Sequence, residues 1–140
     1  MTLLVDSGPL VAYADRLDPH HERVRTLIRA ERQDLVVPAT VTAEADYLLG
    51  SRIGAPARLA FYQDIAAGRL RVECLDAGEH ATVADLHQRY RDLDPGLADL
   101  SIVVLAFRFG TRRILTFDER DFRALRPIQG GAFSLLPADA

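Results

Sequence analysis

Residues 3–9 read Leu-Leu-Val-Asp-Ser-Gly-Pro, an apolar triplet followed at once by a carboxylate and a helix-start signal. The triplet is typical of a short buried strand, whereas Ser7 and Pro9 suit the N-cap and first turn of a helix. A similar order returns at residues 114–118, Ile-Leu-Thr-Phe-Asp. The sequence therefore predicts, twice, a strand that ends beside an acidic residue and leads into a helix.

Apolar runs alternate with amphipathic segments along the rest of the chain. Further strands are predicted at residues 35–37, 70–75, 113–117 and 132–135. Helices are predicted to begin near residues 7 and 18, and to span about 40–49, 57–67, 79–90, 97–109 and 121–125. This alternation indicates an α/β sandwich with a mainly parallel sheet. Because no repeat or long linker divides the sequence, residues 1–140 are expected to form one domain.

The composition is that of an ordinary globular protein, with 49% hydrophobic and 26% charged residues. A single cysteine, Cys74, cannot form an internal disulfide, which favours a reducing compartment. Leu3–Val5 meets Asp6 at once, so no signal peptide is indicated. The longest apolar segment, 97–109, is too short to span a membrane and carries Arg108. We therefore expect a cytoplasmic protein with no membrane association.

All 17 basic residues are arginine, and lysine is absent. The absence excludes a Walker-A phosphate loop and a Schiff-base mechanism, since both need a lysine. The net charge of −3 gives no overall attraction to nucleic acid. Local arginine clusters suit either phosphate recognition or solvated helix faces; they are Arg89/Arg91, Arg112/Arg113 and Arg120/Arg123/Arg126.

Four carboxylates interrupt or end apolar segments where core residues are expected: Asp6, Glu44, Asp99 and Asp118. Buried carboxylates are usually paired or bound to a metal. Asp6 and Asp118 follow predicted strands, whose carboxyl ends meet at one edge of a parallel sheet. Asp99 falls in the first turn of a helix. Taken singly, the four are also explained as a helix cap, a surface charge, a dipole partner and a turn residue; together they predict one acidic site.

Oxygen-only ligands select Mg²⁺ or Mn²⁺ over zinc, and such ions activate water for phosphoryl displacement. The predicted reaction is therefore metal-dependent phosphodiester hydrolysis, with Glu44 orienting or deprotonating a water. Ser7 and Thr116 place hydroxyls beside the carboxylates, where they can hydrogen-bond the ligands. A helix cap and a β-former explain these two residues equally well.

At these residues the chain resembles the PIN-domain ribonucleases, and more narrowly the VapC toxins of type II VapBC toxin–antitoxin pairs. The matching stretches are residues 4–8, 38–48, 96–99, 114–122 and 125–127, with Phe133 near the end. The resemblance implies a compact α/β/α sandwich whose acidic quartet binds Mg²⁺ or Mn²⁺ and cuts RNA. It makes Asp6 and Asp99 the principal metal ligands, with Glu44 and Asp118 completing the pocket.

The resemblance also implies partners: a second copy of the chain in a homodimer, and a small VapB antitoxin. The antitoxin's C-terminal segment is expected to wrap the toxin and place a basic side chain in the acidic pocket. Two departures stand out. Leu100 occupies a position where relatives often have a small residue, and Asp118, Glu119 and Asp121 compete for the fourth acidic position. We choose Asp118 because it directly follows the strand and matches the Thr-x-Asp pattern.

Other classes fit less well. A catalytically silent PIN-like module that binds RNA or a partner is the main alternative, although it gives no reason for four clustered carboxylates. A haloacid-dehalogenase-type phosphatase needs an aspartate where Gly8 stands, and a receiver domain needs a lysine. Nothing in the sequence indicates which RNA is cut.

Overall fold

The structure, a computed structural model, describes residues 1–32 and 34–140 and holds five strands and seven helices within them. In chain order the elements are β1 (Leu3–Val5), α1 (Ser7–Ala14), α2 (His21–Glu31), β2 (Leu35–Pro38), α3 (Ala39–Arg52), α4 (Ala55–Ala66), β3 (Arg71–Glu73), α5 (Ala77–Arg89), α6 (Leu97–Arg108), β4 (Arg113–Leu115), α7 (Glu119–Ala124) and β5 (Ser134–Leu136). The strands form one sheet in the order β3-β2-β1-β4-β5, and every pair is parallel. The predicted α/β class with a mainly parallel sheet is confirmed.

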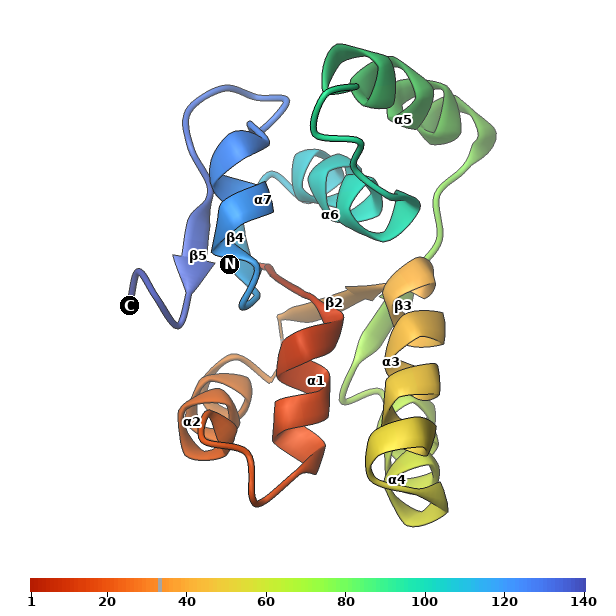
Figure 1. Cartoon of the computed structure of the whole chain (residues 1–140), viewed down its shortest axis with the longest axis vertical. Coiled ribbons are helices and arrows are strands. Elements are labelled where there is room, and N and C mark those ends of the chain that lie inside the picture. Colours follow the sequence, from red (N-terminus) through yellow and green to blue (C-terminus); the bar gives the residue numbers. More distant parts are fainter. Residues whose placement is uncertain (33) are drawn as a thin grey trace.

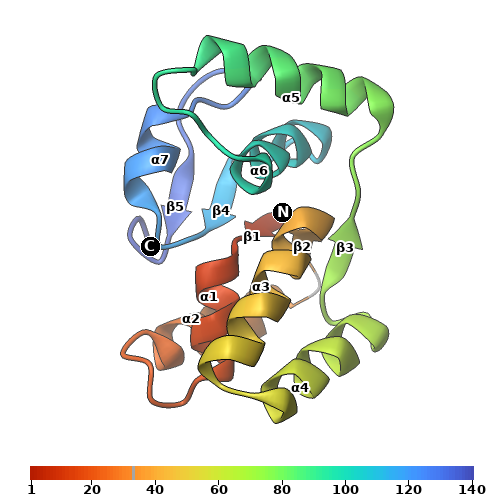
Figure 2. The same ribbon diagram turned by 45° about the vertical axis from the view of Figure 1, so that its right-hand side comes forward.

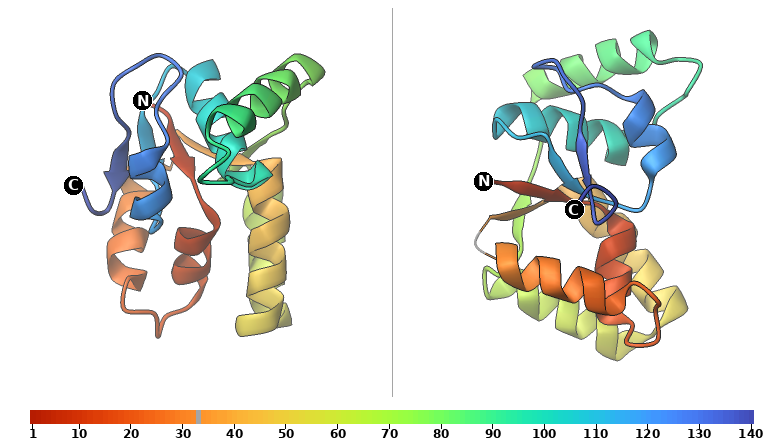
Figure 3. Two further views of the ribbon diagram at one scale, coloured as in Figure 1. Left: turned by 45° about the horizontal axis from the view of Figure 1, so that its top comes forward. Right: turned by 90° about the vertical axis from the view of Figure 1, so that its left-hand side faces the viewer.

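Helices cover both faces of this sheet (Figure 1). Helices α1 to α4 lie on one face, and α5, α6 and α7 lie on the other, as the turned views show (Figures 2 and 3). None of the helices in the described ranges is long and apolar enough to cross a membrane. The resulting three-layer arrangement is the expected α/β/α sandwich.

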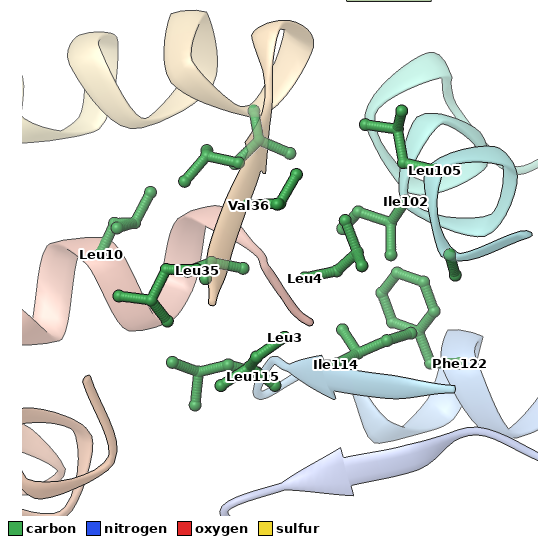
Figure 4. Close-up of a cluster of buried hydrophobic side chains, with 14 of the residues drawn as sticks. Leu3, Leu4, Leu10, Leu35, Val36, Ile102, Leu105, Ile114, Leu115 and Phe122 are labelled. Atoms are coloured by element: carbon green, nitrogen blue, oxygen red, sulfur yellow. The ribbon is translucent and has the colours of Figure 1, made fainter. Parts of the chain in front are cut away.

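The central strand β1 is buried from both sides. Its three residues, Leu3, Leu4 and Val5, have no exposed surface, which explains why the strand reads as a continuous apolar run instead of alternating. Helix α6 and the short helix α7 pack side chains against one face of the sheet, among them Ile102 and Phe122 (Figure 4). Polar side chains return only where the strand ends.

Helix α6 is a buried helix, as its apolar sequence predicts. All seven residues from 100 to 106 are buried, and the helix contacts β1, β2, α3 and α5. A helix buried nearly all round is fixed in position by its neighbours. The first turn of α6, which carries Asp99, is therefore held rigidly.

The sheet has a topological switch point between β1 and β4. From β1 the chain continues to β2 on one side, and only later returns to add β4 on the other side. Val5 is in register with Leu115, and the Asp6 N–H extends the ladder by donating to the Leu115 carbonyl at 2.9 Å. Ligands of open parallel sheets bind beyond the strands at such a point. Asp6 and Thr116 are the first residues beyond it.

Two local predictions are wrong. Ser7 was expected to cap α1, but Asp6 does so: its Oδ1 accepts from the Ser7 N–H at 2.8 Å, and Ser7 is the first helical residue. The strand predicted at 113–117 ends at Leu115. The Thr116 hydroxyl accepts from the Asp118 N–H at 3.0 Å, a Ser/Thr turn that redirects the backbone toward α7.

Candidate active site

A pocket of about 500 Å³ lies beyond the carboxyl ends of β1 and β4. Its lining consists of Asp6, Ser7, Gly8, Glu44, Gly96, Ala98, Asp99, Phe117 and Asp118. The four predicted carboxylates therefore line one pocket, although they come from four separate parts of the chain. No arginine is among these lining residues, so the pocket has negative side chains without a cation in its wall.

Asp6 is the most buried of the four carboxylates, with 9% of its surface exposed. Its Oδ1 accepts from the Ser7 N–H at 2.8 Å, and its Oδ2 accepts from the Thr116 hydroxyl at 2.7 Å. Burial raises the pKa of Asp6 above its ordinary value, and the charges of Glu44 and Asp118 raise it further, while the two hydrogen bonds act against this. The carboxylate is thus held in one orientation by donors from the residues that follow β1 and β4.

Thr116 connects Asp6 to the start of α7. Its hydroxyl donates to Asp6 and accepts the Asp118 N–H. In turn, Asp118 Oδ1 caps α7 by accepting from the Asp121 N–H at 3.1 Å. This chain of three hydrogen bonds fixes Asp6 and Asp118 relative to each other, because a change at one link moves the next.

Asp99 is half-buried in the first turn of α6, as the sequence predicts. Burial raises the pKa of its carboxyl to about 7, and the neighbouring charges of Asp6, Asp118, Asp121 and Glu44 add to the rise. Near neutral pH, Asp99 is therefore divided between its protonated and ionised forms. A cation bound beside it would favour the ionised form.

The structure also brings Asp121 to the site. Carboxylate oxygens of Asp99, Asp118 and Asp121 all lie within 4.8 Å of one another. Glu119, the other alternative for the fourth position, is exposed and pairs with Arg123 at 3.3 Å. Asp118 and Asp121 are three residues apart at the start of a helix, and this spacing is the signal in the sequence that places both side chains on one side of α7. Burial, and then the charge of Asp118, raise the pKa of Asp121.

Glu44 lies at the rim of the pocket and is exposed. Glu44 flanks the buried stripe formed by Val41, Ala45 and Leu49, and the pocket leaves it open to solvent. The Ser7 hydroxyl donates to Glu44 Oε1 at 2.9 Å. Ser7 therefore positions the rim carboxylate, as Thr116 positions the buried one.

The three arginine clusters do not line the pocket. Several of their members make structural contacts instead. Arg113 pairs with Glu31 at 2.7 Å, Arg123 pairs with Asp139 at 2.7 Å, and Arg112 donates to the Gly130 carbonyl. Arg113 joins β4 to the end of α2, Arg123 joins α7 to the C-terminal segment, and Arg112 holds the loop before β5; these contacts explain the three side chains without a role in the pocket.

The donor set of the pocket fits a divalent cation. Every candidate ligand is a carboxylate oxygen, the type that Mg²⁺ and Mn²⁺ prefer. The mutually close group of Asp99, Asp118 and Asp121 could hold such an ion. Its positive charge would relieve the repulsion that raises the pKa of Asp99. Asp6 is less free to rotate, since both of its oxygens already accept hydrogen bonds.

Comparison with known structures supports the fold. VapC20 of Mycobacterium tuberculosis, described as a Sarcin-Ricin loop cleaving toxin, superposes with a TM-score of 0.77 at 19% identity, over 85% of this chain and 92% of that one. VapBC2 of Rickettsia felis, bound to a promoter DNA fragment, gives 0.71 at 14% identity, over 96% of this chain and 98% of that one. DNA-bound VapBC of Salmonella typhimurium gives 0.69 at 16% identity, over 96% of both chains. At these identities the likeness concerns the fold alone.

Comparison of sequences shows the family. The model of the PIN domain matches residues 3–126. Ribonuclease VapC26 of Mycobacterium tuberculosis is 41% identical over 135 residues, which are 96% of this chain and 100% of that protein. Together with the acidic pocket at the switch point of the sheet, these matches show that the chain belongs to the PIN-domain family, among its VapC-type ribonucleases.

Proposed function

We propose that the protein is a Mg²⁺- or Mn²⁺-dependent endoribonuclease, the toxin of a toxin–antitoxin pair, and that it hydrolyses RNA phosphodiester bonds in the acidic pocket. The observation that carries the proposal is the convergence of Asp99, Asp118 and Asp121, whose oxygens lie within 4.8 Å of one another. Asp6 and Glu44 line the same pocket. The whole chain, residues 1–140, would act as one PIN domain.

Each acidic residue has a proposed role that follows from its position. Asp99 and Asp118 would hold the cation, Asp121 would join them, and Asp6 would complete the ligand set from the buried side. Thr116 keeps Asp6 oriented through its 2.7 Å hydrogen bond. When bound, the divalent cation neutralises charge on the phosphate and lowers the pKa of a water.

Glu44 is suited to accept a proton from the attacking water. Its Oε1 is engaged by the Ser7 hydroxyl at 2.9 Å, so the side chain has a fixed orientation at the rim. A carboxylate that is exposed and held in this way can receive a proton through its other oxygen, Oε2. The phosphate would contact the cation held by the carboxylates of α6 and α7. The attacking water would approach from the side of α3, where Glu44 lies.

A VapB-type antitoxin is the proposed partner, because two of the structural relatives are VapBC complexes. A second groove, of about 1140 Å³, offers it a place to bind. The groove combines apolar residues such as Leu10 and Phe61 with the arginines Arg25 and Arg29, a mixture that suits an amphipathic segment with acidic residues. A basic side chain of that segment would be stabilised in the acidic pocket. A homodimer and a cytoplasmic location complete the proposal.

The alternative is a catalytically silent PIN-like module. It would need no cation, so titration of Mn²⁺ into the metal-free protein separates the two proposals. An enzyme that binds Mn²⁺ gains thermal stability as the ion is added. The absence of any thermal shift at millimolar Mn²⁺ would favour the silent module.

Cleavage of RNA is the direct test. Purified protein should cut single-stranded RNA with Mg²⁺ or Mn²⁺, and EDTA should stop the reaction. Asp6→Asn and Asp99→Asn should each remove cleavage while far-ultraviolet circular dichroism stays unchanged. Asp85→Asn, which removes an exposed carboxylate on α5, is the matched control and should retain full activity. Cleavage that persists in EDTA, or in both pocket variants, would contradict the proposal.

A further inference from the structure

One wall of the acidic pocket is aromatic. Among the residues that line the pocket in the described part of the chain, Phe117 is the one aromatic side chain; the others are acidic or small. Phe117 is half-buried, so part of its ring is open to the pocket. It also lies between Thr116 and Asp118, two residues of the hydrogen-bond chain that fixes the carboxylates. The ring is therefore placed directly beside the reacting groups.

Neighbouring residues hold the Phe117 ring in place. A Cβ added at Gly8 would lie 3.2 Å from Phe117 Cδ2, which shows how closely the backbone of α1 approaches the ring. The exposed His20 ring lies 4.6 Å from it between centroids, at an interplanar angle of 35°. The backbone is fixed as well, since the Thr116 N–H donates to the Leu136 carbonyl at 3.0 Å. A ring fixed in this way loses little entropy when a ligand packs against it.

The pocket also has open space beside Gly96, at the start of α6. Gly96 has φ −81° and ψ 173°, an extended conformation that any residue adopts. A Cβ added there would meet no atom within 4 Å. Glycine at this position therefore satisfies no backbone demand, and its effect is to leave the pocket wide at the start of α6. That space is available to a flat group of the substrate.

We propose that Phe117, backed by His20, is the surface on which the pocket stacks the nucleobase next to the phosphodiester bond that is cut. The inference rests on the proposed ribonuclease function. Single-stranded RNA is commonly recognised by stacking unpaired bases on aromatic side chains. The carboxylates and the cation would engage the phosphate, and Phe117 would engage the adjacent base. Phe117 is thus a positioning residue that sets the register of the strand against the carboxylates.

This role has a consequence for specificity. Every base has a π face, so stacking on Phe117 tolerates different bases. It does require the base to be unpaired and turned out of a helix. The pocket would therefore select an exposed, single-stranded position in RNA more strongly than a particular base at that position.

The test uses a fluorescein-labelled oligoadenylate decamer, and the same decamer with abasic residues at its centre. Binding to the full-length protein is followed by fluorescence anisotropy with Ca²⁺, another ion that takes oxygen ligands, in place of Mn²⁺, so that binding is measured without cleavage, and a gel confirms that the decamer is intact. The wild type should bind the intact decamer about 10-fold more tightly than the abasic one. Phe117→Leu keeps an apolar side chain but removes the π face, so it should bind both decamers with equal, weak affinity. Phe117→Tyr should behave as the wild type.

A purely structural role for Phe117 gives a different result. In that case Phe117→Leu would weaken binding of both decamers in proportion and keep the 10-fold preference, which would overturn the proposal. Should Phe117→Leu fail to fold, as judged by thermal unfolding, His20→Ala replaces it, because His20 is exposed. That variant should lose part of the preference. A wild type that takes up Mn²⁺ but neither binds nor cuts RNA would refute the ribonuclease function itself, and the stacking surface with it.

Discussion

The two halves of the acidic pocket differ in how their carboxylates are held. In one half, here called the strand half, the carboxylates receive hydrogen bonds from residues that follow β1 and β4: Asp6 from Thr116 and the Ser7 N–H, and Glu44 of α3 from the Ser7 hydroxyl. At the starts of α6 and α7, the carboxylates of Asp99, Asp118 and Asp121 lie close to one another. The strand half is organised by donors of the protein. The other half, here called the helix half, contains one such hydrogen bond, from the Asp121 N–H to Asp118, but it mainly brings like charges together.

The two halves therefore contribute differently to the site: the strand half orients its carboxylates, and the helix half provides the oxygens that would bind the cation. A carboxylate that already accepts two hydrogen bonds is positioned in the metal-free protein and changes little when a cation binds. Clustered carboxylates repel one another until a cation binds. The pKa of Asp99 is raised to about 7 by burial first, and then by this repulsion. Burial and the charges of Glu44 and Asp118 also raise the pKa of Asp6, so the ionised carboxylates of both halves cost stability without the ion, and in the strand half the hydrogen bonds offset part of that cost.

The largest expected effect is on activity, and it comes with unequal effects on stability. Asp99→Asn and Asp6→Asn should each reduce RNA cleavage by more than about 100-fold, since even outer partners of metal ligands contribute 10- to 100-fold. Without metal, Asp99→Asn should raise the unfolding midpoint because it removes a half-buried charge from a repulsive cluster. Asp6→Asn also removes a buried charge, but an amide cannot accept both hydrogen bonds and one donor is left unpaired, so this variant should be less stable than Asp99→Asn by about 1 kcal/mol.

Single-turnover cleavage and urea unfolding in EDTA measure these two quantities. Asp85→Asn on α5 serves again as the control for loss of a carboxylate, and should change neither. If both pocket variants shift the unfolding midpoint in the same direction and by the same amount, the two halves of the pocket do not differ as proposed.

Asp121 and Glu119 provide a matched pair for the next effect. Asp121→Asn removes one of the three converging carboxylates and should weaken Mn²⁺ binding by about 10-fold or more. Glu119→Gln removes a carboxylate of the same helix that pairs with Arg123 outside the cluster, and should leave Mn²⁺ affinity unchanged. Isothermal titration calorimetry of the two variants compares them directly. Equal losses would mean that net charge, and not position in the cluster, determines the affinity.

Thr116 tests the strand half. Thr116→Val keeps the shape of the side chain but removes both the donor to Asp6 and the acceptor for the Asp118 N–H. Activity should fall by about 10-fold, the usual size for a residue that orients a metal ligand. Thr116→Ser keeps the hydroxyl and should recover most of the activity, as measured by the cleavage rate at saturating Mn²⁺. A serine variant as slow as the valine variant would show that packing, not the hydrogen bonds, is what matters.

Much of the fold could be predicted from the sequence, because the signals are local. Short apolar runs bounded by helix starts indicate strands, and carboxylates that directly follow two such strands must meet at one edge of a parallel sheet. The start of α7 was harder to predict. Whether Asp118, Glu119 or Asp121 turns toward Asp99 depends on where the helical register begins, and one residue changes the direction by about 100°.

Contacts between distant segments could not be predicted. The hydrogen bond that Glu44 accepts from Ser7 depends on how α3 packs against α1. The packing of His20 on Phe117 depends on how the connection between α1 and α2 returns toward the end of β4. Neither residue belongs to a periodic pattern that would reveal its neighbour. The cap of α1 was misplaced by one residue for a related reason, since Asp6 and Ser7 are both good N-caps and the strand geometry decides between them.

The smallest effect, and the most specific to the helix half, is on the pH dependence of stability in EDTA. The pKa of Asp99 rises from an ordinary value of 3.8 to about 7 in the folded protein. The folded state therefore holds a proton that the unfolded state releases, and the stability due to this group is complete below about pH 4 and lost as pH rises through 7. Between about pH 5 and 8 the unfolding midpoint should fall by a few degrees. Carboxyls with lowered pKa values, such as Asp139 at about 2, titrate below this window.

Asp99→Asn should flatten the curve of unfolding midpoint against pH. Saturating Mn²⁺ should reverse the slope of that curve, because the ion binds the ionised carboxylate. A slope that survives in Asp99→Asn would assign the titration to Asp6 or Asp121, whose pKa values are also raised, and the same measurement on Asp6→Asn would distinguish the strand half from the helix half.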